Sequence, residues 1–188
     1  MFQGRRLLKR GHFTPLVLCA LLGCAGNVRK ATDFTLRQGS RLAFLDFQVE
    51  DISDPDKRYV NVSAEFIDAF NSCLLSGPLT ILDRAHIKRI LKEQTRAQSG
   101  LFSPSEIVSI GQLLQAEYLV LGSGKVAETG NDLFLRVASI RMIDVTTGQV
   151  VASGYVEGGG VRPARRGHAL GCELRQILSR KPAKSPRY

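Results

Sequence analysis

The hydrophobic pattern of this 188-residue chain changes after Gln115, from the spacing of helices to that of strands. Residues 117–123, 133–145 and 150–156 are apolar runs that predict three strands. Residues 146–149 (TTGQ) predict a tight turn, so the last two runs form an antiparallel hairpin. A fold for this chain must therefore place a hairpin and a third strand together at the end of the sequence.

Earlier in the chain, short apolar runs alternate with amphipathic stretches. Residues 42–47 (LAFLDF) and 79–82 (LTIL) predict two buried strands. Between these strands, Val62, Phe66 and Phe70 fall on one face of a predicted helix. This strand–helix–strand order is typical of a sheet that carries helices on its faces.

Capping residues and the period of the apolar positions predict three further helices. Asp83 is placed as the N-cap of one, and residues 103–106 (SPSE) form a capping box at the start of the next. Residues 164–178 predict the last helix, after a glycine-rich loop at 158–160. The expected fold class is α/β (α+β): a mixed β-sheet with helices packed on it, in a single domain without transmembrane hairpins.

The N-terminus has the three parts of a bacterial lipoprotein leader. A cationic segment (residues 5–10) precedes an apolar run (13–22) that is too short to span a bilayer. The run ends in LLGC, in which Cys24 stands where such proteins are cut and acylated. Residues 1–23 are therefore predicted to be a lipoprotein signal peptide. An ordinary secretory signal, a weak membrane anchor or a twin-arginine signal are the alternatives.

Lipidation of Cys24 would tether the remaining chain to a membrane. Residues 24–40 are predicted to be a linker that lifts the domain off the membrane, residues 41–180 the α/β domain, and residues 181–188 a basic disordered tail. Ala25 replaces the aspartate that favours inner-membrane retention in enterobacterial-type sorting. By this analogy, the protein is expected on the periplasmic face of the outer membrane.

The formal net charge of +9 gives little support to nucleic-acid binding. Part of the excess lies in the leader and much of the rest lies between Arg162 and Tyr188. A nucleic-acid binder would more often carry basic residues on a folded face, interleaved with aromatic residues. Nucleic acid is therefore not an expected partner.

Two cysteines remain in the predicted domain, Cys73 and Cys172, each in a predicted helix. They could form a disulfide in an oxidising periplasm, or they could be two small buried hydrophobic residues. No CxxC or Cys/His spacing was found that suggests a metal, and neither His86 nor His168 has a cysteine or acidic partner at a telling spacing. No metal site is predicted.

No catalytic motif is apparent. The stretch GSGK at residues 122–125 resembles a phosphate loop, but Leu119 and Val126 stand where the Walker motif needs glycine and a hydroxyl residue. Ser123, Ser139 and Ser153 lie in predicted strands without the context of a nucleophile elbow. The protein is therefore expected to have no catalytic residues and no cofactor, and not to be an enzyme.

Four stretches carry a resemblance to a known family. They are RLAFLDF, LTILDRAHIKRILKEQ, IGQLLQAEYLVLGS and MIDVTTGQVV, in this order between about residues 41 and 156. In sequence and spacing they resemble the curli production assembly/transport component (CsgG-type) family of outer-membrane lipoproteins. Related flagellar lipoproteins and activators of peptidoglycan synthases share the α/β domain.

The resemblance implies a lipoprotein that acts by protein–protein contact in secretion or envelope assembly. The alternatives are an activator of a peptidoglycan synthase (a penicillin-binding protein) and a subunit of an oligomeric secretion pore. The pore is the less expected, because the segments flanking the last hairpin are too short for membrane hairpins. The expected partners are the membrane, through the lipid on Cys24, and a periplasmic or outer-membrane protein, with homo-oligomers left open.

Overall fold

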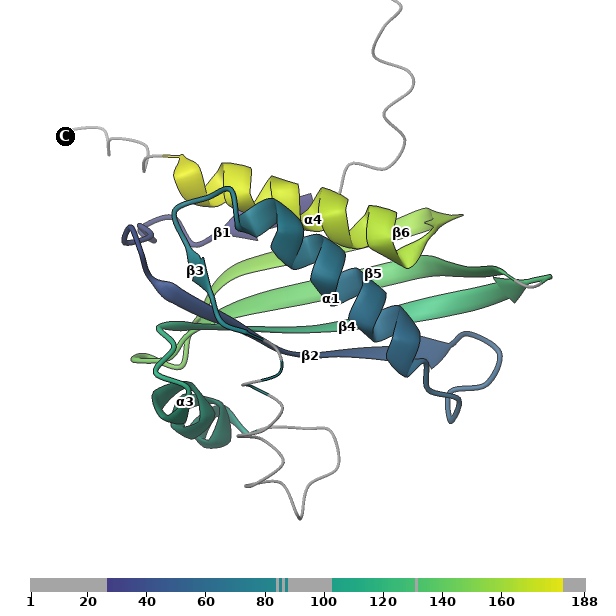
Figure 1. Cartoon of the computed structure of the whole chain (residues 1–188), viewed down its shortest axis with the longest axis horizontal. Coiled ribbons are helices and arrows are strands. Elements are labelled where there is room, and N and C mark those ends of the chain that lie inside the picture. The colour runs from purple at the N-terminus through teal and green to yellow at the C-terminus, as the bar shows by residue number, and fades with distance from the viewer. Residues whose placement is uncertain (1–26, 84, 86, 88–102, 131, 181–188) are drawn as a thin grey trace, which may run out of the picture.

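A six-stranded mixed sheet with three helices makes up the described part of the chain (Figure 1). The computed structural model describes residues 27–83, 85, 87, 103–130 and 132–180. The strands are β1 (Asn27–Lys30), β2 (Arg41–Asp51), β3 (Thr80–Ile81), β4 (Tyr118–Thr129), β5 (Asp132–Asp144) and β6 (Val150–Val161). The helices are α1 (Val60–Leu74), α3 (Pro104–Leu113) and α4 (Pro163–Ser179). None of these helices is long and apolar enough to cross a membrane.

The strand order is β1-β6-β5-β4-β2-β3. Strand β2 runs parallel to β3 and β4, whereas β4, β5, β6 and β1 pair antiparallel in succession. The predicted fold class, an α+β domain with a mixed sheet, is confirmed. The predicted hairpin is also present, with Gly148 at a positive φ of 69° in its turn.

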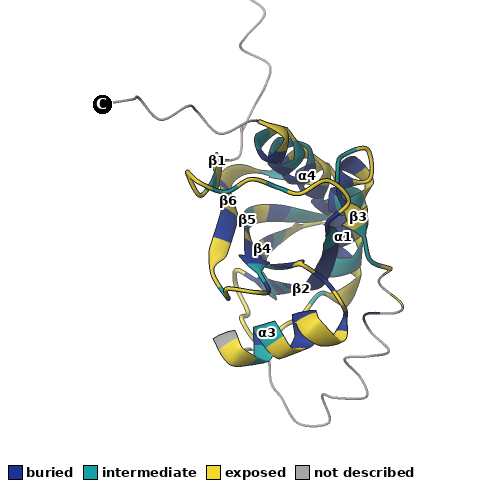
Figure 2. Cartoon of the chain, turned by 90° about the vertical axis from the view of Figure 1, so that its left-hand side faces the viewer, coloured by how far each residue is buried: buried dark blue, intermediate teal, exposed yellow. Residues whose placement is uncertain are grey.

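Helices cover the two faces of the sheet unequally (Figure 2). Helices α1 and α4 pack on one face over the larger apolar core, where Phe47 of β2 stacks on Phe66 of α1 with 3.8 Å between ring centroids. Helix α3 packs on the opposite face through Ile107, Ile110 and Leu114. The apolar cluster under α3 covers only one end of that face. The uncovered part, on β5, β6 and β1, is exposed to solvent and carries mainly polar side chains.

Helices α1 and α4 lie in backbone contact. A Cβ atom at Gly167 or Gly171 would stand 2.3 or 2.4 Å from the carbonyl oxygen of Phe66 or Phe70. The two glycines are one turn apart on α4, so together they form the surface on which α1 rests. This contact fixes which side chains of the two helices face each other.

Replacing Gly171 by alanine is expected to lower the free energy of unfolding by about 1–3 kcal/mol, because the helices must move apart to admit the methyl group. Helix propensity alone would give the opposite sign, since alanine is favoured over glycine by about 1 kcal/mol. Urea unfolding measures the change. Ala169→Gly, at an exposed position of the same helix, is the control for propensity and should cost about 1 kcal/mol. A more stable Gly171→Ala variant would contradict the close contact.

The predicted capping box at the start of α3 is confirmed. The Ser103 hydroxyl accepts a hydrogen bond from the backbone N–H of Glu106, and the Glu106 carboxylate accepts one from the backbone N–H of Ser103. The predicted strand at 79–82 is present as the two-residue β3. Most of the helix predicted after Asp83 lies outside the described residues.

The predicted linker is the main correction to the domain boundaries. Residues 27–30, inside that linker, are strand β1, which pairs antiparallel with β6. Phe34 and Leu36 pack against the core, and the Phe34 ring meets the Tyr118 ring edge-on at 5.5 Å between centroids. The folded domain therefore begins by Asn27 rather than at residue 41. Four residues with one inward side chain, Val28, are too few to show a strand period in the sequence.

Two glycine-rich segments belong to strands. The predicted loop at 158–160 is part of β6, which continues until Val161 pairs with Leu135. The stretch at 122–125 lies in β4, where its glycines make room for an aromatic ring: a Cβ atom at Gly122 would lie 2.6 Å from the ring of Phe47. Packing against that ring explains these glycines without a phosphate ligand.

Candidate functional site

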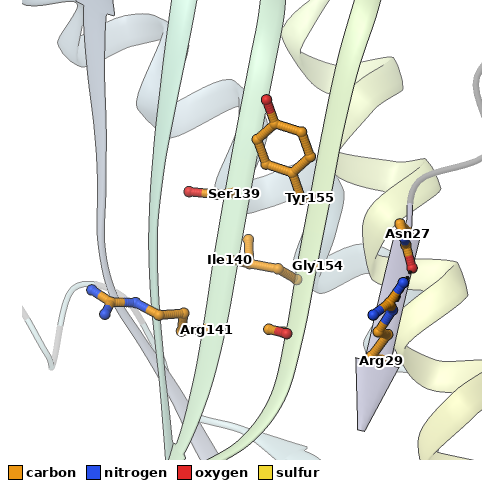
Figure 3. A pocket seen from close by; sticks show the side chains of 8 residues that line it. Asn27, Arg29, Ser139, Ile140, Arg141, Gly154 and Tyr155 are labelled. Carbon is orange, nitrogen blue, oxygen red and sulfur yellow. Dashed lines mark hydrogen bonds between the residues drawn. The ribbon is translucent and has the colours of Figure 1, made fainter.

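A shallow pocket of about 410 Å³ lies on the sheet face opposite α1 and α4, beyond the end that α3 covers. Strands β1, β5 and β6 form its floor (Figure 3). The lining residues are Asn27, Arg29, Ser139, Ile140, Arg141, Ser153, Gly154 and Tyr155. Side chains alternate between the two faces of a strand, so Ser139 and Arg141 of β5 face the pocket while Ala138, Ile140 and Met142 face the core.

Strand register places two arginines on either side of one serine. Ser153 of β6 lies directly opposite Arg141 of β5 on one side and Arg29 of β1 on the other. All three residues are exposed. Directly opposed residues have Cβ atoms about 5 Å apart, so the two arginines start about 10 Å apart. In Figure 3 the Arg141 side chain extends toward β4, away from Arg29, so side-chain rotation is needed to bring both guanidinium groups to one ligand group. We call Arg29, Ser153 and Arg141 the arginine row.

A second row of polar side chains runs beside the arginine row. Ser139, Tyr155 and Asn27 are directly opposed across the same three strands. The Ser139 hydroxyl lies 2.9 Å from that of Ser123, and the Asn27 carbonyl oxygen accepts a hydrogen bond of 3.0 Å from Arg29 Nε. The latter contact orients the guanidinium of Arg29 while leaving its terminal N–H groups to other partners.

Tyr155 is the large apolar surface of the pocket, with a relative exposure of 47%. Its hydroxyl donates a hydrogen bond to the carboxylate of Glu157, and this bond raises the pKa of Tyr155 above its usual value of 10. The phenol is therefore neutral at physiological pH. The positive charge of the two arginines is not offset by a tyrosinate.

The chemistry of the lining residues suits binding rather than catalysis. Two guanidinium groups and several hydroxyl groups can hold a carboxylate or phosphate group. Among the described residues that line the pocket there is no histidine or carboxylate that could act as a base toward Ser139 or Ser153. The expectation that the protein is not an enzyme stays a prediction.

The predicted disulfide and the predicted lipidation site both lie away from the pocket residues. Cys73 of α1 and Cys172 of α4 form a disulfide, with 5.2 Å between their Cα atoms. The bond joins the helices beside the glycine contact, on the sheet face opposite the pocket. Cys24, the predicted lipidation site, lies outside the described residues, three positions before β1.

Sequence reasoning missed the contact between His168 and Cys172 and the pocket on β1, β5 and β6. His168 was predicted to have no cysteine partner at a telling spacing, and this is wrong: its Nδ1 lies 3.7 Å from Cys172 Sγ. The i,i+4 spacing on a helix was the available signal. The pocket was missed because its rows depend on strand β1, which lay inside the predicted linker.

Comparison with known proteins establishes no family for this chain. No protein-family model and no curated protein matches the sequence. Solved structures similar to the chain include the LpoB C-terminal domain from Salmonella enterica, at 17% sequence identity and a TM-score of 0.46, covering 68% of this chain and 85% of that one. A PelC dodecamer from Paraburkholderia phytofirmans has 16% identity and a TM-score of 0.47, covering 83% and 99%. Lipoprotein GNA1162 from Neisseria meningitidis has 15% identity and a TM-score of 0.47, covering 75% and 97%. The resemblance to the curli-assembly family stays a prediction.

Proposed function

We propose that this protein is a lipid-anchored envelope protein that binds an acidic segment of another envelope protein through the pocket on β1, β6 and β5. The observation that carries the proposal is the arginine row, in which Arg29 and Arg141 flank Ser153 on an exposed sheet face. Paired guanidinium groups are the side chains best suited to hold carboxylates.

The mixture of residues in the pocket favours a protein as partner. Arginine and tyrosine are enriched in protein–protein interfaces, where tyrosine supplies apolar area and arginine supplies directed hydrogen bonds. Tyr155 lies in the row next to both arginines. Binding to an anionic lipid surface would require the positive charge of the arginines. It would gain little from the tyrosine ring and the hydroxyl groups of the pocket.

The pocket would lie close to the membrane. If Cys24 is the lipidated first residue, three peptide steps separate it from Asn27, and three residues span at most about 11 Å. Asn27 itself lines the pocket. A partner in this pocket would therefore bind near the bilayer surface. The protein would act on membrane-bound envelope proteins on the periplasmic side of the outer membrane.

Two finer functions fit this proposal, and we place activation of a peptidoglycan synthase before a role in curli assembly. The curli role rests on a sequence resemblance that no family model supports. A synthase activator needs only a tethered domain with a binding surface for its enzyme, and the arginine row offers such a surface.

Charge reversal tests the proposed surface. The lipidated protein is titrated against a purified bifunctional penicillin-binding protein, and the Kd and the polymerisation rate of the synthase are measured. The double variant Arg29→Glu/Arg141→Glu is expected to weaken binding at least tenfold, because like charges across an interface cost free energy. Arg165→Glu, an exposed arginine on α4 at the opposite sheet face, is the matched control and should bind as the unchanged protein does.

Three results would contradict parts of the proposal. Equal binding by the double variant and the unchanged protein would exclude the arginine row as the interface. No binding to the synthase would exclude the activator function. Binding to phosphatidylglycerol vesicles that depends on Arg29 and Arg141, without binding to protein, would make lipid headgroups the ligand.

A further inference from the structure

A histidine and two cysteines meet where α1 crosses α4, away from the pocket. Cys73 of α1 is bonded to Cys172 of α4, and His168 lies one helical turn before Cys172. The sulfur and imidazole nitrogen atoms of these three residues lie within 4.8 Å of one another. Nδ1 and Nε2 of His168 are 3.7 and 3.8 Å from Cys172 Sγ.

The backbone holds these three side chains together independently of the disulfide. Gly167 and Gly171 of α4 touch the carbonyl groups of Phe66 and Phe70 on α1. This contact fixes the distance between the two helices at this point. Cys172 directly follows Gly171. The facing positions of Cys73 and Cys172 are therefore expected to persist when the sulfur–sulfur bond is opened.

We propose that reduction of this disulfide creates a Zn²⁺ site formed by Cys73, His168 and Cys172. Two thiolates and one imidazole are ligands that Zn²⁺ prefers, and three protein ligands leave a fourth position for water. With zinc–sulfur bonds of about 2.3 Å, two sulfurs in a tetrahedral site stand about 3.8 Å apart. Side-chain rotation can reach this separation from Cα atoms that lie 5.2 Å apart.

The conversion needs an external two-electron reductant, of which a dithiol is one class. The dithiol gives two electrons and two protons to the Cys73–Cys172 bond and is itself oxidised to a disulfide, leaving two protein thiols. Zn²⁺ then binds as the two thiols release their protons. Since the same sulfurs form the disulfide and the metal ligands, the two states exclude each other.

Exposure of the three ligands defines how a metal ion would enter. Cys73 is buried, Cys172 is half-buried and His168 is exposed. An ion would therefore meet His168 first and the buried Cys73 last. In either state, α1 and α4 are cross-linked at the same point, so the metal replaces the covalent bond as the link between the helices.

Cobalt binding to the reduced full-length protein tests the proposal. The disulfide is opened with a phosphine reductant under anaerobic conditions, and Co²⁺ is added while the thiolate-to-cobalt charge-transfer absorption is followed. One Co²⁺ per chain is expected, in tetrahedral geometry and displaced by Zn²⁺, with no such absorption in the oxidised protein. His168→Ala should lower the affinity by more than the roughly 10- to 100-fold that loss of an outer-sphere partner costs.

Gln176→Ala is the matched control, because Gln176 is exposed and lies one turn after Cys172 as His168 lies one turn before it. This variant should bind Co²⁺ as the unchanged protein does. Circular dichroism follows the fold throughout: if the reduced protein unfolds, Zn²⁺ should restore its helices. No charge-transfer band in the reduced protein, equal affinity in His168→Ala, or failure of Zn²⁺ to refold an unfolded reduced chain would each overturn the proposal.

Discussion

Replacing Cys24 by alanine is expected to move the protein from the membrane fraction to the soluble periplasmic fraction. Each acyl methylene buried in a bilayer contributes about 0.8 kcal/mol, so several chains on one cysteine hold a protein firmly and their loss releases it. The described helices provide no membrane-spanning segment to replace the lipid. Cell fractionation and vesicle flotation measure the change.

Cys19→Ala is the matched control for this experiment. Cys19 lies in the same apolar run but is predicted to leave with the leader, so its replacement should not alter membrane association. If the Cys24→Ala protein floated with the vesicles, lipidation would not be the attachment and the predicted lipoprotein leader would be wrong. The proposed position of the pocket near the bilayer would then also lose its basis.

The double variant Cys73→Ala/Cys172→Ala is expected to lose about 2–5 kcal/mol of unfolding free energy. The disulfide joins residues 99 positions apart, and closing a loop of about 100 residues removes chain entropy worth about 4.7 kcal/mol from the unfolded state. Alanine keeps the sites small and apolar, so little of the loss should come from packing. Urea unfolding with and without reductant measures the effect.

Reductant distinguishes the disulfide from other effects of the substitutions. The unchanged protein should lose a similar amount of stability when reduced, and the double variant should not respond to reductant. An unchanged protein whose unfolding midpoint is the same under both conditions would show that the bond does not stabilise the fold. These measurements are made with chelator present, since Zn²⁺ would otherwise link the helices again in the reduced protein.

Several elements of the fold were predictable because their signals are local. The capping box at Ser103 and Glu106 needs only residues three positions apart, and both oxygens find the expected N–H groups. The hairpin between β5 and β6 follows from two apolar runs and a glycine that can take positive φ. In α1, the apolar face identifies Val62, Phe66 and Phe70 as residues that pack on the sheet, and it misses only Ile67 among the buried residues of this helix.

Elements whose evidence is distant in the sequence were not predictable. Strand β1 has four residues, and its place in the sheet depends on β6, more than 100 positions away. The same distance hides the arginine row, since Arg29 and Arg141 meet only when both strands pair with β6. The glycines at 158–160 resemble a loop locally, but pairing with β5 extends the strand through them.

The sequence by itself determined the class of fold and the positions of most helices and strands, because each depends on residues within a few turns or one short segment. The lipid anchor on Cys24 stays a prediction from the sequence. The tertiary structure decided where the domain begins, how the arginine row is assembled, and that Cys73, Cys172 and His168 meet. The physical reason is that pairing of strands and crossing of helices bring together residues whose separation along the chain carries no periodic signal.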